Sequence, residues 1–172
     1  MKAEEFNQRL SAGEKNFSGV DLSGEDLSKM DLSEIKLTDA ILKQTNLQGA
    51  RLKAAELTGA DLSQANLESA NLTGASLYEA NLFKTNLVKA RLDQASLQGA
   101  NLTQANLTEA NLIQTDLSTA NLTEANLTNV DLGKAIYRTT DFSYADLTKA
   151  NLDGVNLDNM VLKNAVLPEG VK

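Results

Sequence analysis

A leucine recurs at every fifth position through most of this chain, as residues 99–130 show: GANLTQANLTEANLIQTDLSTANLTEANLTNV. In an α-helix, a step of five residues rotates each leucine by roughly 140° from the previous one, so the leucines would cover every side. In a β-strand, an odd step points successive leucines to opposite faces. Neither element gives a one-sided core. The pattern therefore predicts a coiled solenoid, in which five residues complete one unit and the next unit turns its leucine toward the same interior.

The register of this repeat runs without insertion or deletion through one continuous domain at 17–167, and 28 of its 31 central residues are Leu. The exceptions are Phe17, Tyr137 and Phe142. The residue two positions before the centre is Ala in 19 of the 31 units, so we predict that both positions point inward. The residue just before the centre is Asn or Asp in 21 units, and these side chains favour turns because they bond neighbouring backbone groups. Gly two positions after the centre, as at Gly49, suits a turn with a positive φ.

The repeating triplets carry a resemblance to a known family. Ala100-Asn101-Leu102 and Ala145-Asp146-Leu147 resemble the A(D/N)LXX signature of pentapeptide-repeat proteins, and the resemblance covers about nine tenths of the chain. It implies an all-β fold, a right-handed quadrilateral β-helix with four pentapeptides per square coil. On that value, 31 units make seven to eight coils, and at about 4.8 Å per layer the rod is roughly 35 Å long. The opening AGEKNF also resembles capped members common in cyanobacteria.

Each open end of such a rod exposes apolar core and backbone groups without neighbours, so each end needs a cover. We predict an N-terminal cap at 1–16, with a short helix at residues 3–12. Phe6 and Leu10, four positions apart, would then lie over the first coil near Phe17.

The opposite end carries apolar residues where the repeat expects polar ones. Val161 and Val166 stand at positions that usually hold Asn or Asp, and Pro168 opens a tail at 168–172 that stops further strand pairing. The apolar residues of this end are Val161, Leu162, Val166 and Leu167. They suggest a homodimer contact, which the family resemblance also implies, and local packing of the chain end is the alternative.

A second candidate surface lies in the middle of the chain. Tyr78, Phe83 and Val88 occupy the outward position after the centre in three consecutive units, and Ile113 does so one coil later. In a four-sided coil the first three lie at one level on adjacent faces. An aromatic belt on a polar rod is typical of a partner site, and scattered surface variation is the alternative.

Catalysis has no support in the residue types present. The chain has no histidine and no cysteine, and it contains no glycine-rich phosphate loop and no metal-ligand spacing. We therefore expect no enzymatic activity, no cofactor and no metal. The first sixteen residues include early acids and no apolar run, and no 18-residue apolar stretch follows. We expect a cytoplasmic protein that binds no membrane.

Two functions fit these observations. The first is a structural or interaction module for an unidentified protein. The second, implied by the family resemblance, is a mimic of B-form DNA that inhibits or protects DNA gyrase. The net charge of −7 argues against direct nucleic-acid binding and permits the mimic. However, the five acids between Arg91 and Lys134 would spread over all four faces of the coil and form no phosphate-like stripe. The interaction module is therefore our main hypothesis.

Overall fold

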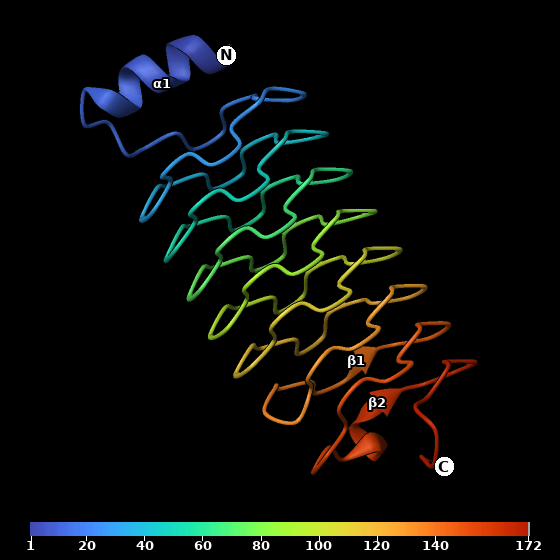
Figure 1. The fold of residues 1–172 in the computed structure, drawn as a ribbon. Helices are drawn as coiled ribbons and strands as arrows, with labels where there is room; N and C mark the ends of the chain where they lie inside the picture. The colour runs from blue at the N-terminus through green and yellow to red at the C-terminus, as the bar shows by residue number, and fades with distance from the viewer. Residues whose placement is uncertain (172) are drawn as a thin grey trace.

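The molecule is a straight stack of coils with a helix at one end (Figure 1). The structure is a computed structural model and describes residues 1–171, so only Lys172 of the predicted tail lies outside it. Helix α1 (Ala3–Ser11) covers the N-terminal end. Near the other end lie strand β1 (Thr140–Asp141), the 3-10 helix η1 (Leu157–Asn159) and strand β2 (Met160–Val161).

Successive coils are joined by parallel bridges between residues that are 20 apart. Ile41 pairs with Asp21 on one side and with Asp61 on the other. The Leu22 N–H donates to the Ile41 carbonyl, and the Ile41 N–H donates to the Val20 carbonyl, both at 2.8 Å. Since 20 residues hold four pentapeptides, each coil has four sides, as the family resemblance implied. Almost every side contributes a single bridging residue before the next corner, which is why β1 and β2 are the longest strands in residues 1–171.

The corners are turns with a left-handed third residue. At one such corner the Leu47 carbonyl accepts the Ala50 N–H at 3.0 Å, and Gly49 between them has a φ of 64°. Every corner from residue 19 to residue 164 has a positive φ except those at Lys134 and Asn159. Most of these corner residues are not glycine; Gln94, for example, has a φ of 62°. This conformation costs an L-residue on the order of 1 kcal/mol, so the bonds between layers impose a geometry that the local sequence only weakly favours.

The interior follows the predicted pattern of large and small residues. The central leucines from Leu22 to Leu132 are fully buried, and the inward alanines between them are nearly so. Four threonines replace alanine at the inward position: Thr45, Thr85, Thr115 and Thr140. Each buried hydroxyl donates to a leucine carbonyl 23 residues earlier, as Thr45 does to Leu22 at 2.8 Å. The narrow core therefore holds polar atoms without leaving them unsatisfied.

Helix α1 covers the first coil as predicted. Phe6 is fully buried, and its ring lies 4.5 Å from the ring of Phe17, centroid to centroid. Leu10 is partly buried against the same core. The helix thus replaces the layer that a preceding coil would supply.

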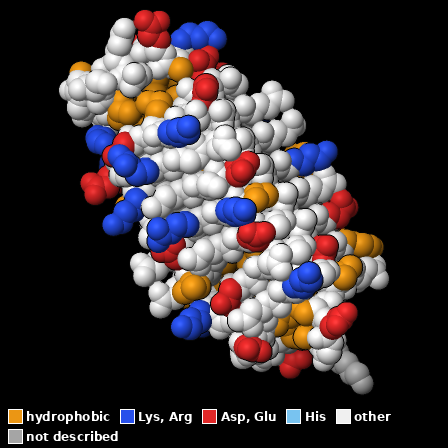
Figure 2. All heavy atoms as spheres, in the orientation of Figure 1, with side chains coloured by type: hydrophobic (Ala, Val, Ile, Leu, Met, Phe, Trp, Pro, Cys, Tyr) orange, Lys and Arg blue, Asp and Glu red, His pale blue; other side chains and the backbone are white. Residues whose placement is uncertain are grey.

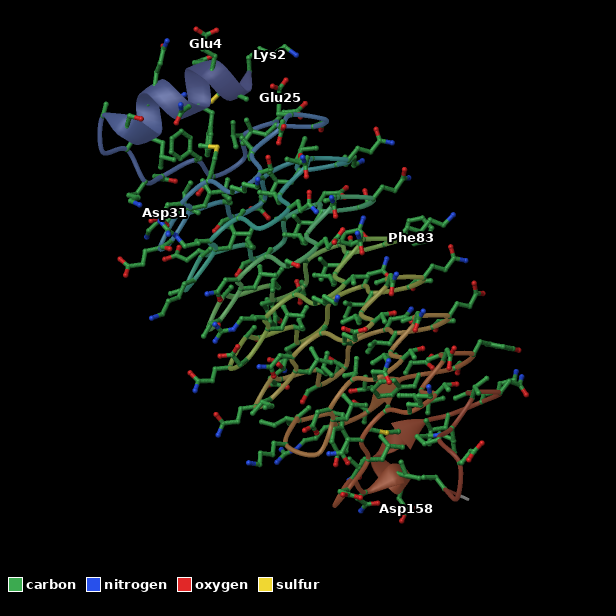
Figure 3. The ribbon with its side chains drawn as sticks, in the orientation of Figure 1. Lys2, Glu4, Glu25, Asp31, Phe83 and Asp158 are labelled. Atoms are coloured by element: carbon green, nitrogen blue, oxygen red, sulfur yellow. The ribbon has the colours of Figure 1, made fainter. Side chains whose placement is uncertain are left out.

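A carboxylate from the first coil holds the start of this helix. Glu25 occupies an inward position, where most units carry Ala, and its side chain is 16% exposed. Its carboxylate accepts the Ala3 N–H and the Lys2 ammonium, each at 2.8 Å. Lys2, the residue before the helix, makes no side-chain cap of its own. The Glu25 carboxylate therefore caps the N-terminus of α1, although Glu25 is 22 residues from Ala3 in the sequence. Figure 3 shows Lys2 and Glu25 close together.

This contact gives the cap a dependence on pH. The hydrogen bond from Lys2, followed by that from the Ala3 N–H, holds the pKa of the Glu25 carboxyl below its usual range. The stabilisation is therefore complete above the unfolded-state pKa of about 4.3 and is lost as the pH falls through the lower folded-state value. We expect Glu25→Gln to speed amide exchange in α1 at pH 6 and to have a smaller effect near pH 2. Exchange measured by NMR at both pH values tests this, with the exposed Glu34→Gln as control; an equal effect of Glu25→Gln at both would contradict it.

The bridge between adjacent coils is missing at one place in the described residues, on the side that carries residues 136 and 156. The expected bridge between Ile136 and Asn156 is missing, although every other pair of adjacent coils from residue 16 to residue 166 is bridged on all sides. Tyr137 stands at the central position of this side and remains partly exposed, and its hydroxyl accepts the Asn156 N–H at 3.2 Å. The Tyr137 hydroxyl therefore takes the N–H that the Ala135 carbonyl would accept in the regular register. Phe142, the next central residue, is fully buried.

Tyr137→Leu is accordingly expected to stabilise the protein. With the smaller side chain, the backbone at position 137 can form the normal hydrogen bonds to the next coil. We expect the free energy of unfolding to rise by about 1 kcal/mol and the melting temperature to rise by a few degrees. Calorimetry and amide exchange of residues 156–159 measure the change. The matched control is Phe142→Leu, which leaves a cavity and is expected to destabilise. A lower melting temperature for Tyr137→Leu would show that the tyrosine supports this coil.

Candidate functional site

The aromatic belt extends over three sides of the rod and does not form a single patch. Tyr78, Phe83 and Val88 lie on three successive sides at one level, as the 20-residue register requires. Tyr78 is 40% exposed, whereas Phe83 and Val88 are half-buried. The Lys84 ammonium lies 5.0 Å from the centre of the Phe83 ring, and Figure 3 shows Phe83 at the outer edge of the stack. Because Tyr78 and Val88 face opposite directions, one flat partner cannot contact both.

Ile113 lies apart from the belt on the fourth side and is 36% exposed. The structure therefore keeps the four predicted residues at the surface but does not bring them together. Their role in binding stays a prediction.

The apolar residues of the C-terminal end are exposed. Val161 is 49% exposed and Val166 is 54% exposed, and both lie on outer sides of the last coil. Leu162 and Leu167 point toward the core but remain half-buried. No residue among 1–171 covers this end in the way that α1 covers the other, and hydrophobic side chains are visible there in Figure 2.

Tyr144 extends this apolar surface to the side of the rod. It is 51% exposed and lies one layer away, at the corner between the sides that carry Val161 and Val166. Its backbone N–H donates to the Lys163 carbonyl at 2.8 Å, which fixes this position relative to the last coil. The sequence gives no direct sign of the cluster, since its residues become neighbours only once four units complete a coil. We call Tyr144, Val161, Leu162, Val166 and Leu167 the C-terminal apolar surface.

Two hollows open at this end of the rod. One has a volume of about 320 Å³, and its apolar lining includes Leu152, Val155 and Leu157. The other has a volume of about 550 Å³ and is lined by Val166, Leu167 and neighbouring residues. An apolar surface with hollows beside it can bury side chains from a partner.

The acidic residues form no continuous stripe. The bridge register places the acids between Arg91 and Lys134 on all four sides, as predicted: Asp93, Glu109, Asp116, Glu124 and Asp131. In the N-terminal half, acids are partly neutralised by bases, as where the Arg51 guanidinium lies 2.7 Å from Asp31. That contact holds the pKa of the Asp31 carboxyl far below its usual range. The surface therefore mixes both signs of charge.

On one side of the rod, Asp and Asn side chains that are 20 residues apart form a ladder of hydrogen bonds along part of the stack. Side-chain amides donate to the oxygen one layer away at 2.9–3.4 Å along the series Asp26, Asn46, Asn66 and Asn86. Further along, Asn106 instead accepts the N–H and the hydroxyl of Thr108 within its own unit. These side chains satisfy one another and the local backbone, so they serve the structure and offer no ligand site.

Within residues 1–171, no three His, Cys, Asp or Glu side chains gather as a metal site. No helix in that range has the length and apolarity needed to cross a membrane.

The repeat matches a known protein family. The family described as "Pentapeptide repeats" matches in overlapping segments that together extend from residue 16 to residue 168. No curated protein sequence matches the chain significantly.

Several solved structures are similar. Rfr23, a pentapeptide repeat protein from the cyanobacterium Cyanothece 51142, is 22% identical over 97% of this chain and 95% of its own, with a TM-score of 0.50, and this likeness shows the fold. HetL from the cyanobacterium Nostoc sp. strain PCC 7120, described as involved in heterocyst differentiation regulation, is 28% identical over 99% of both chains, with a TM-score of 0.33. QnrB1, a plasmid-mediated fluoroquinolone resistance protein, is 17% identical over 91% of this chain and 88% of its own, with a TM-score of 0.46.

Proposed function

Because the chain belongs to the pentapeptide-repeat family, whose members form right-handed β-helices, we propose that it is a non-enzymatic, rigid module for protein interaction. The observation that carries this proposal is the C-terminal apolar surface. A rod whose coils are bridged at every pair of sides but one has little freedom to adapt to a partner, so binding needs a preformed apolar surface with few mobile groups to order. The exposed fractions of Tyr144, Val161 and Val166, each near one half, supply that surface.

The partner of this end is either a different protein or a second copy of the chain. A second copy gives an isologous contact, in which the same apolar residues meet across a two-fold axis. The mass measured by light scattering at tens of micromolar protein distinguishes the two cases. The aromatic belt remains a separate proposed contact, carried mainly by Tyr78 because its side chain is the most exposed of the three.

Immobilised protein incubated with a native cell extract tests the module. We expect a retained protein, or the chain itself, to be lost when Val161→Asn and Val166→Asn are combined. Both changes restore the residue that the repeat prefers at this position, so the fold is preserved. Ile41→Asn is the matched control, since Ile41 occupies the same repeat position near the other end and is 38% exposed. Equal retention by all variants would remove the C-terminal surface from the proposal.

The belt is tested in the same experiment by the triple change Tyr78→Ser, Phe83→Ser and Val88→Thr. Loss of a retained protein from this variant alone places the contact on the belt. Retention that is unaffected by either set of changes, and that high salt abolishes, contradicts an apolar contact altogether.

The DNA mimic is the second candidate, favoured by the net charge of −7 and the run of acids between Arg91 and Lys134. Its weakness is the spread of these acids over four sides. A gyrase supercoiling assay decides it: no effect at micromolar protein eliminates the mimic, and inhibition relieved by salt supports it.

A further inference from the structure

We propose that the C-terminal end binds a basic amphipathic helix of a partner protein, with two large apolar residues four positions apart facing the coil. This inference rests on the proposed function and names the chemistry of the partner at the same surface.

The first argument is that the chain closes its other end in this way. The four central residues of the first coil are Phe17, Leu22, Leu27 and Leu32, and all are buried beside or beneath α1. The four central residues of the last coil are Leu152, Leu157, Leu162 and Leu167, and all remain partly exposed. The two ends carry the same kind of core in the same register and differ in whether a helix lies over it. The helix that closes the first end presents Phe6 and Leu10, four positions apart.

The second argument is the shape of the end. Phe6 packs its ring against Phe17 at a centroid distance of 4.5 Å, so a single large side chain can replace a missing layer at the centre of a coil. At the C-terminal end, a hollow of about 320 Å³ lies between the apolar side chains of Leu152 and Leu157 and the tail residues Pro168 and Val171, with Asp153 and Glu169 in its lining. A Phe or Leu side chain on the partner helix would bury there.

The third argument is charge. An ion pair with the first coil holds the start of α1: Lys2, the residue before the helix, lies 2.8 Å from Glu25. The rim of the last coil carries Asp153, Asp158 and Glu169, all exposed, against two bases, Lys163 and Lys149, the second of which lines the larger hollow. None of the three acids forms an ion pair within residues 1–171. Asp158 lies at the lower end of the rod in Figure 3. The rim therefore attracts a basic helix.

The same charges disfavour a second copy at this end. Two identical ends would bring three acids and two bases from each chain into one contact, and the excess of like charges facing each other across an interface opposes association. A basic helix removes that repulsion, which is why we place a helix and not a second copy on this surface.

The probe is a synthetic peptide of residues 1–12 in which Glu5→Lys adds a base and a lactam joins Glu4 to a lysine introduced by Gln8→Lys. The lactam is needed because a helix this short is marginal in water. Titration of the isotope-labelled full chain is followed by NMR. We expect shifts at Leu152, Leu157, Leu162 and Leu167, and none at Phe17. The control peptide carries Phe6→Asp and should not bind.

Two variants of the protein separate the arguments. Asp153→Asn combined with Asp158→Asn should weaken peptide binding by about threefold or more at low salt and by less at high salt. Val161→Asn combined with Val166→Asn should weaken it at any salt, whereas Ile41→Asn should leave it unchanged.

Each other outcome overturns the inference. If the peptide does not bind and light scattering shows a dimer that the two valine changes dissociate, the end takes a second copy, and the interaction module stands without the helix. If the peptide binds only at the belt or at the first coil, the end is not a helix site. If the peptide does not bind, the chain is monomeric and no extract protein depends on the valines, both the helix and the C-terminal interaction site are wrong.

Discussion

Leu87→Ala is expected to lower the free energy of unfolding by about 3–5 kcal/mol, because Leu87 is a fully buried central residue in the middle of the stack. Asn86 bonds to Ala65 and Leu67 in the layer before, and Leu87 bonds to Asn106 in the layer after, so the coil spacing is fixed and the backbone cannot collapse into the space that the side chain leaves. The cavity therefore persists and adds to the lost transfer free energy. Urea unfolding followed by circular dichroism measures the loss, provided that the transition remains a single step.

The matched control is Leu167→Ala. Leu167 has the same repeat position and lies on the same side of the rod, but it is half-buried at the open end. We expect a loss of about 1 kcal/mol, since part of its surface already contacts water and no coil within residues 1–171 covers it from the other side. Equal losses at both positions would show that the coils do not act as a rigid stack.

Phe6→Ala is expected to uncover the first coil. Phe6 is fully buried and supplies the main apolar contact between α1 and Phe17, so its removal should cost about 3–5 kcal/mol of local stability. Since each coil contacts only its neighbours, the loss should be concentrated at the N-terminal end. Amide exchange measured by NMR should show faster exchange in α1 and in the coil that begins at Phe17, with little change beyond the middle of the rod.

Gln8→Ala is the control for this prediction, because Gln8 is exposed on the same helix and makes no side-chain hydrogen bond within residues 1–171. It should leave the exchange of the first coil unchanged. Faster exchange throughout the rod in Phe6→Ala would mean that the cap governs the cooperativity of the whole stack and not only of its first layer.

The predictable part of the fold comes from interactions within one or two units. Inward Leu and Ala, turn-forming Asn and Asp, and the helix over the first coil were all evident in the sequence, and helix α1 ends one residue before the predicted boundary at residue 12. The positive φ at corners was predicted only for glycines. The structure extends it to residues such as Gln94, because the turn is imposed by the stack and not by the corner residue.

Candidate surfaces were harder to predict. The sequence identified Val161 and Val166 because each breaks a strict local preference, but it gave no reason to group them with Tyr144. It also gave no role to Glu25, whose partners lie 22 and 23 residues away at the start of α1. Tyr137 was visible as an exception to leucine, but the bond of its hydroxyl to Asn156, 19 residues away, depends on how the coils stack.

The sequence by itself determined the five-residue unit, because each unit repeats the same choice of inward and outward side chains and any slip would bury a polar residue. Only the tertiary structure decided that four units close a coil. That closure depends on backbone hydrogen bonds between residues 20 apart, such as that from Leu22 to Ile41, and backbone groups are the same at every position, so no local pattern records it. The neighbours on the surface, and hence the C-terminal apolar surface, follow from that closure.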